Sequence, residues 1–213
     1  MNNRLRLIVI FLGTLVVIAV YTFPYWQPLL EIELVEDGFP GLTEEQRAAF
    51  ALLTPEQREA YEDLLEENRE MAIAMARAAL SPDSIVPTEE QGLTGITAPE
   101  QRAVGLFSRV DDIRAGSGTA RLYQFPDNTR VLRLEDFRVT NGPNLHIYLT
   151  RNPEPRKPED IGTDYIDLGE LKANTGNQNY PVPIEVDFSV YRGVIIYSAS
   201  LNIVYSSASM ALT

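Results

Sequence analysis

The sequence of 213 residues contains no cysteine and only one histidine, His146. Without thiols, the chain cannot form disulfides, thiolate metal sites, iron–sulfur clusters or a lipid-modified cysteine, and it has no thiol nucleophile. A metal centre built from several imidazoles is excluded as well. The absence of cysteine leaves the cellular compartment open, because exported proteins without disulfides are common.

Positive charge is scarce, with 18 Lys and Arg residues against 30 Asp and Glu residues and a formal net charge of −12. The acidity is concentrated in residues 31–104, which hold 17 acidic and 5 basic residues. Residues 105–213 are close to neutral, with 13 acidic and 11 basic residues. Neither region has the basic surface that a phosphate backbone requires, so we expect no nucleic-acid partner.

One long apolar run lies near the N-terminus. The 17 residues from Leu7 to Phe23 carry no charge, which is close to the shortest helix that crosses a hydrocarbon core of ~30 Å. Arg4 and Arg6 precede the run, and aromatic residues follow it where rings favour the headgroup layer. We predict that residues 1–26 form a single-pass transmembrane anchor in the cell membrane, with a cytoplasmic N-terminus and the rest of the chain extracytoplasmic.

A cleaved signal peptide is the alternative interpretation of this run. Signal peptidases require small residues after the apolar region, whereas residues 22–26 read Thr-Phe-Pro-Tyr-Trp. Bulky rings and proline fit such a cleavage site poorly, so the pattern favours an uncleaved anchor.

Residues 27–80 are predicted to form an acidic helical stalk. Leu42–Arg47 and Leu53–Arg58 repeat the pattern Leu-Thr-x-x-Gln-Arg, which is typical of capping boxes at helix starts. We expect a short helix over residues 43–52 and a single helix over residues 55–80. The apolar positions of the second helix follow a helical period that Asn68 interrupts.

The stalk allows two interpretations, and in both of them its apolar stripe needs a partner. Its carboxylates could bind a cation or a protein partner, but charged helix faces are more often simply solvated. The stripe could pack on another helix, on a second copy in a homo-oligomer, or on the domain that follows. Residues 81–104, rich in Pro, Thr, Gly and Glu, are predicted to be a linker.

Residues 105–213 have the pattern of a β domain. Short segments of alternating or β-branched residues are separated by Gly, Pro, Asn and Asp, which predicts a mainly β fold, an antiparallel sandwich or barrel. In the turn Asn141-Gly142-Pro143, we expect the glycine to supply a positive φ angle. The predicted strands are residues 106–110, 118–125, 130–139, 144–150, 164–168, 180–186, 193–199 and 201–206.

Several motifs of this domain, in their order, resemble the DM13 domain family. They are Gly105-Leu106-Phe107, Gly116-Ser117-Gly118-Thr119-Ala120, Val131–Phe137, Thr140–Leu149, Ile166–Lys172, Gly176–Tyr180 and Val194-Ile195-Ile196-Tyr197. The resemblance covers residues 105–212 and implies an electron-transfer role. That role was proposed for a cysteine in the penultimate strand, acting as a free thiol or as a ligand of a group such as haem.

This chain departs from the family at the positions that matter for that chemistry. Ser198 follows Tyr197 at the cysteine position, and Arg114 stands where the family often has a histidine. A serine hydroxyl neither cycles between redox states nor ligates haem iron well. The redox role that the resemblance implies therefore lacks its central residue here.

The candidate cofactor-binding residues are His146, Ser198 and Tyr197, with haem as the alternative cofactor. Thioethers of Met71, Met75 and Met210 could add a ligand. The sequence nevertheless favours a hydrogen-bonded structural histidine beside Tyr148 as the interpretation of His146. A serine nucleophile at residue 198, 200 or 206 would need His146 within reach, and no nucleophile-elbow motif is present. We predict no catalytic residue and no metal site.

The loop over residues 174–180 is dense in side-chain amides. It could be a recognition loop, or part of a hard-cation site with Asp164 and Asp167. Asn side chains also mimic backbone turns, which favours a role in the fold. Together these patterns predict a membrane-anchored, non-catalytic binding or assembly module, with electron transfer as the alternative.

Overall fold

The computed structural model describes residues 14, 20–23, 38–88 and 99–213. The predicted transmembrane anchor, residues 1–26, falls almost entirely outside these ranges. No helix within the described ranges is both long and apolar enough to cross a membrane. The chain divides into two units, Met1–Gly38 and Phe39–Thr213, and the second unit holds the helices and the β domain together.

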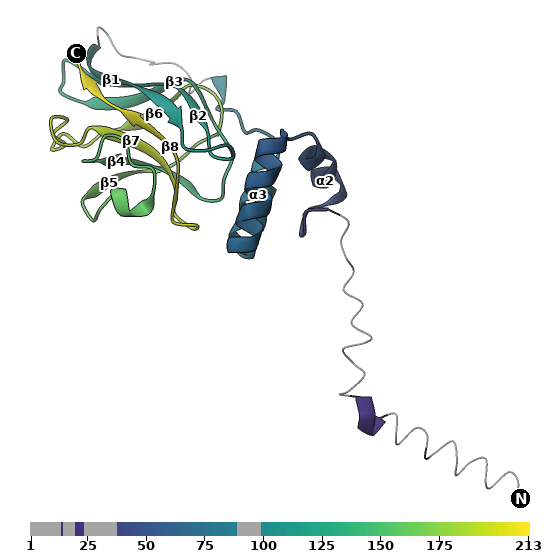
Figure 1. The fold of residues 1–213 in the computed structure, drawn as a ribbon. Helices are drawn as coiled ribbons and strands as arrows, with labels where there is room; N and C mark the ends of the chain where they lie inside the picture. The colour runs from purple at the N-terminus through teal and green to yellow at the C-terminus, as the bar shows by residue number, and fades with distance from the viewer. Residues whose placement is uncertain (1–13, 15–19, 24–37, 89–98) are drawn as a thin grey trace, which may run out of the picture. The chain divides into compact units, whose positions relative to one another are not determined.

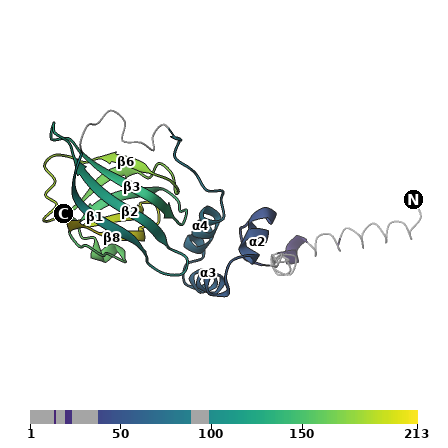
Figure 2. The same ribbon diagram turned by 90° about the horizontal axis from the view of Figure 1, so that it is seen from above.

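The β domain is an antiparallel sheet of nine strands that curls into a nearly closed barrel (Figures 1 and 2). The strand order is β5-β4-β7-β8-β1-β2-β3-β6, and β9 pairs with β1. This confirms the predicted mainly β, antiparallel fold, although the first strand begins before residue 105. The strands are β1 (Glu100–Arg109), β2 (Gly116–Gln124), β3 (Arg130–Val139), β4 (Leu145–Thr150), β5 (Tyr165–Glu170), β6 (Gln178–Pro181), β7 (Gly193–Ser198), β8 (Ile203–Ser209) and β9 (Ala211–Leu212).

The barrel interior is filled by alternate residues of its strands, because successive side chains of a strand point to opposite faces. Leu132 and Leu134 of β3, Ile147 and Leu149 of β4, and Ile196 of β7 are fully buried in one core cluster. The residues between them face outward. On β7, Ile195 and Tyr197 join a second, smaller apolar cluster on the outer face.

The helical segment begins with the two capping boxes that the sequence predicts. They start α2 (Glu44–Ala51) and α3 (Pro55–Glu67), where Thr43 pairs with Gln46 and Thr54 pairs with Gln57. The prediction of a single helix over residues 55–80 is wrong. Asn68 ends α3 in an extended conformation and starts α4 (Arg69–Ala79), because its side-chain oxygen accepts from the Met71 N–H at 3.1 Å. A short amide side chain competes with helical hydrogen bonds in this way.

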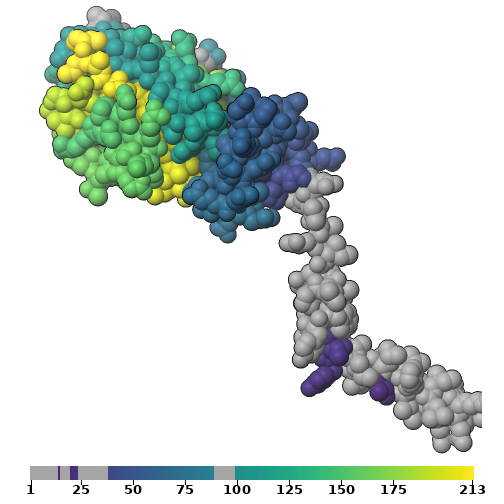
Figure 3. Space-filling view, viewed as in Figure 1, coloured from purple at the N-terminus to yellow at the C-terminus, as the bar shows by residue number. Residues whose placement is uncertain are grey.

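The helices pack onto the barrel instead of standing clear of it (Figure 3). Tyr61 of α3 and Met75 of α4 are buried in the same core cluster as Phe137 and Tyr205 of the barrel. The apolar stripe of the predicted stalk is therefore covered in part by the β domain of its own chain. This answers a question that the sequence left open.

Two glutamines fasten the helices in addition to capping them. The Gln57 amide accepts from the Thr54 N–H at 3.1 Å and donates to the Asp112 carbonyl of the β1–β2 turn at 3.3 Å. In the same way, the Gln46 amide accepts from the Thr43 N–H and donates to the Arg77 carbonyl of α4, both at 3.2 Å. The Gln57 side chain thus connects the start of α3 to the β1–β2 turn, and the Gln46 side chain connects the start of α2 to α4.

The first part of the predicted linker, residues 81–88, is attached to the barrel. The Ser84 N–H donates to Asn174 Oδ1 at 2.7 Å, and Arg138 forms an ion pair with Asp83 at 2.7 Å. Asn174 also donates to the Asp83 carboxylate, and Gln178, fully buried, donates to the Ala173 carbonyl. These contacts give Asn174 and Gln178 structural roles, which agrees with the prediction that the amide-rich loop over residues 174–180 serves the fold.

Candidate functional site

The three predicted cofactor residues meet at the end of β7, but on two different faces of the sheet. β7 lies between β4 and β8, and its register places Tyr197 opposite His146 and Ser198 opposite Leu145. Tyr197 belongs to the outer apolar cluster, whereas Leu145 belongs to the barrel core. His146 and Tyr197 therefore face outward and Ser198 faces inward, so a single cofactor cannot be held by all three side chains.

The Ser198 hydroxyl is fully buried and its hydrogen bonds are satisfied. Its Oγ donates to the Pro143 carbonyl at 2.6 Å and accepts from the Leu201 N–H at 3.3 Å. The two partners belong to the turn before β4 and the turn after β7. Ser198 thus joins two turns at one end of the barrel, which is a structural task that a hydroxyl performs well.

The turn before β4 is packed tightly against β8. A Cβ at Gly142 would lie 2.4 Å from the Tyr205 ring, so the glycine is required for space. The expectation that Gly142 supplies a positive φ angle is wrong, because the left-handed residue of this turn is Asn144, at φ 48°. Asparagine tolerates that conformation better than other residues with side chains.

His146 has both ring nitrogens within hydrogen-bond distance of neighbouring side chains. Nδ1 lies 3.0 Å from Asp167 Oδ2, and Nε2 lies 3.2 Å from Asn144 Oδ1. The ring also makes an edge contact with Tyr148, with a centroid distance of 6.0 Å. These contacts match the expectation of a hydrogen-bonded histidine beside Tyr148.

The outer face beside His146 carries three tyrosines in contact. Tyr148 stacks on Tyr165 with a centroid distance of 4.6 Å and lies 5.0 Å from Tyr197. Burial, with a contribution from the Asp167 charge, raises the pKa of Tyr148 to about 12. Burial also raises the pKa of Tyr197, whose hydroxyl donates to Asn202 Oδ1. Tyr148 and Tyr197 are therefore neutral at physiological pH, and the cluster of rings is an apolar patch with polar tips.

The remaining sequence candidates are separated in space. Ser206 faces inward and donates to the Ser108 carbonyl at 2.8 Å, so it cannot form a nucleophile–base pair with the outward-facing His146. Asp164 binds Arg151 and Tyr191, whereas Asp167 binds His146. Arg114, at the position of the family histidine, forms an ion pair with Asp111 and donates to the Val204 carbonyl.

These side chains do not fit a haem-like cofactor. Residue 198 offers a buried hydroxyl that already donates to Pro143, and His146 lies on the opposite face with both nitrogens engaged. Iron ligation in proteins uses imidazole, thiolate, thioether or phenolate groups that point to a common centre. No such convergence is found at this site.

Sequence reasoning missed Asn144, Asp167 and Tyr165 as neighbours of the predicted residues. The pairing of β4 with β5 places His146 near Asp167 and Tyr148 near Tyr165. The alternation in β4 shows that His146 and Tyr148 share a face, but the neighbouring strand could be identified only from the fold.

One comparison with known proteins identifies the family of the β domain. Residues 108–210 match the model of the family described as "Electron transfer DM13". The chain therefore contains a DM13 domain, as the sequence motifs indicated, in a form without cysteine. The comparisons with curated proteins and with solved structures found no match.

Proposed function

We propose that this chain is a membrane-anchored, extracytoplasmic protein whose DM13 domain acts as a non-catalytic binding or assembly module. The observation that supports this proposal is the state of residue 198. The position of the family thiol is taken by a buried serine hydroxyl with satisfied hydrogen bonds, and His146 faces the other way. A domain that has lost its redox residue but kept its fold still offers surfaces for binding.

The alternative is electron transfer, which the family description favours. It would require a cofactor on the outer face of the sheet, away from Ser198, held by His146 or by the tyrosines beside it. Absorption spectroscopy of the full-length protein, purified from its native membrane, separates the two functions. We expect no Soret or flavin band. Such a band, lost on His146→Ala, would show a bound redox cofactor, support electron transfer and contradict the proposal of a cofactor-free binding module.

The anchoring part of the proposal is carried by the sequence of residues 1–26. Membrane fractionation tests it, since an anchored chain stays in the membrane pellet after an alkaline wash. A protease added to intact cells should then digest the β domain. Release by the wash, or protection of the β domain from the protease, would contradict the predicted topology.

The assembly part is tested by crosslinking on intact cells. We expect the chain to be captured with a protein partner and to co-purify with it. A strictly monomeric chain with nothing bound after purification from the membrane would contradict this part of the proposal.

A further inference from the structure

A groove lies between the helical segment and the turn that joins β1 to β2. Its cavity of about 470 Å³ is lined by α3, α4, residues 111–114 of the turn and Ile203 of β8. We call it the helix–turn groove. Its apolar lining includes Leu64, Met71, Met75, Ile113 and Ile203. The volume lies in the range of protein ligand sites, and methionine side chains adapt to different apolar surfaces.

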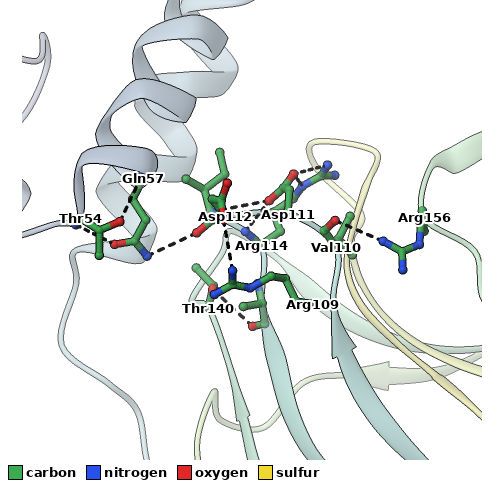
Figure 4. A network of polar contacts seen from close by, with 11 residues as sticks. Thr54, Gln57, Arg109, Val110, Asp111, Asp112, Arg114, Thr140 and Arg156 are labelled. Carbon is green, nitrogen blue, oxygen red and sulfur yellow. Dashed lines mark hydrogen bonds and ion pairs between the residues drawn. The ribbon is translucent and has the colours of Figure 1, made fainter.

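The turn that forms one wall is held in place by its own hydrogen bonds (Figure 4). The Asp111 carboxylate accepts from the Ile113 N–H at 3.1 Å and from the Arg114 N–H at 2.7 Å. Gln57 of α3 fixes the turn from the other side by donating to the Asp112 carbonyl. A wall fixed in this way needs little ordering when a ligand binds, which lowers the entropic cost of binding.

The charge of the lining is negative and only partly compensated. Asp111 pairs with Arg114 at 2.6 Å and Asp112 pairs with Arg109 at 3.1 Å. Asp63 and Glu67, one helical turn apart on α3, are exposed and have no cationic partner within 4.0 Å among the residues that the structure describes. The groove therefore combines an apolar floor with two free carboxylates on its rim.

We infer that the helix–turn groove binds a basic, apolar segment of a protein partner. Aliphatic side chains of that segment would lie on Leu64, Met71 and Ile203, which are the partly exposed apolar residues of the lining. A Lys or Arg of the segment would pair with Asp63 and Glu67. This inference rests on the proposed binding function and names the chemistry of the partner. Charge complementarity of this kind gives an interface its specificity and speeds association.

A second copy of this chain does not suit the groove. α3 carries six acidic residues and one arginine over Pro55–Glu67, so two copies meeting through this helix would bring like charges together. A small organic cation would satisfy the rim carboxylates, but it would leave the apolar floor exposed to water.

The test uses a fluorescent, helix-forming peptide of Leu and Lys, with Leu at positions i, i+3, i+4 and i+7. The full-length protein is held in nanodiscs of zwitterionic lipid, with empty nanodiscs as the blank, and binding is followed by fluorescence anisotropy. The double variant D63N/E67Q should weaken binding about tenfold. Its matched control, E62Q/E66Q, makes the same charge change on α3 outside the groove and should weaken binding less than about twofold.

Two further measurements address the apolar floor. Met71→Gln should weaken binding about fivefold, because it replaces apolar area with an amide. A companion peptide with Ala in place of each Leu keeps its charge and should bind at least about tenfold less tightly. Equal weakening by the two charge pairs, equal binding of the companion peptide, or no saturable binding would each overturn the inference.

The outcomes also separate this inference from the function on which it rests. A cofactor band that disappears on His146→Ala would overturn the proposed function, whatever the peptide does. No peptide binding, together with a spectrum free of cofactor bands, would overturn the groove and leave a binding module that uses another surface.

Discussion

Two polar sites lie at the same end of the barrel and differ in how completely their groups are satisfied. At the end of β7, Ser198 is buried and hydrogen-bonded to both neighbouring turns. Ile203, which pairs with Ser198 across β7 and β8, also lines the helix–turn groove, whose rim carries free carboxylates. A group whose hydrogen bonds are complete holds the fold together, whereas a free charge beside an apolar floor is available to a partner.

The two sites also differ in their origin within the chain. Ser198 lies inside residues 108–210, which match the DM13 family. The helix–turn groove is built partly from α3 and α4, which precede the matched residues. The surface that we expect to bind is therefore created by adding a helical segment to a domain of this family.

The largest effect is expected for Gly142→Ala, which tests whether the turn before β4 is tightly packed. The new Cβ would collide with the Tyr205 ring, and we expect a loss of about 3 kcal/mol in the free energy of unfolding, because neither the ring nor the turn can move freely. Chemical denaturation measures this loss. Gly162→Ala is the control. An alanine would be strained at the left-handed φ of 72°, but its Cβ would meet no neighbouring atom, so the free energy of unfolding should fall by only about 1 kcal/mol. Equal costs for the two variants would show that the turn is not tightly packed.

The outer face beside His146 is tested by alkaline pH. The folded-state pKa of Tyr148 is about 12, above the ordinary value of 10.0. The stabilisation from its neutral form is therefore complete below pH 10 and is lost as the pH rises to about 12. The loss should approach about 1.4 kcal/mol per pH unit for this group. Denaturation at several pH values should show a shallower decline for Tyr148→Phe, and an unchanged decline would contradict the burial of this hydroxyl.

Ser198→Ala tests whether the hydroxyl fastens the two turns. We expect a loss of about 1 to 2 kcal/mol in the free energy of unfolding, because the Pro143 carbonyl and the Leu201 N–H lose their common partner. The companion variant Ser198→Cys places a thiol at the family position. A thiol reagent should modify it only in denaturant, and fast modification of the folded protein would show that the site is open.

The smallest effect is expected for His146→Ala. Its hydrogen bonds to Asp167 and Asn144 are near the surface, so we expect a loss of about 1 kcal/mol or less in the free energy of unfolding. Thermal melting of the purified protein measures this loss. A drop of several kcal/mol would show that His146 supports more of the barrel than its contacts indicate.

Much of the fold could be predicted from local patterns in the sequence. Alternation and turn residues predict the strands, and the Thr-x-x-Gln pattern predicts the starts of α2 and α3. In the sequence, the break at Asn68 shows only as an interruption of the apolar stripe, because a helix period does not show whether an amide side chain will cap a new helix. The docking of the helices on the barrel, which places Tyr61 and Tyr205 in one core cluster, could not be predicted, since it joins residues that are far apart in the chain.

The site could be predicted only in part, for the same reason. Because Tyr197 and Ser198 are adjacent in a strand, alternation alone indicates that they face opposite sides. The partners of His146 depend on the order of the strands. The helix–turn groove depends on where α3 docks, and the sequence alone does not distinguish Asp63 and Glu67 from the other carboxylates of a solvated helix face.

Gln46 and Gln57 each cap a helix and also bind a neighbouring element, which makes the opening of these elements cooperative. Gln57 uses one end of its amide to start α3 and the other to hold the β1–β2 turn, and Gln46 does the same between α2 and α4. When the start of α2 or α3 unfolds, its glutamine also loses the hydrogen bond to the neighbouring element. Conversely, when that element moves away, the amide of the capping glutamine loses the carbonyl to which it donates. Local fraying of the helical segment is thereby tied to separation of the helices from the barrel, and amide protons at both helix starts should exchange with solvent as one group.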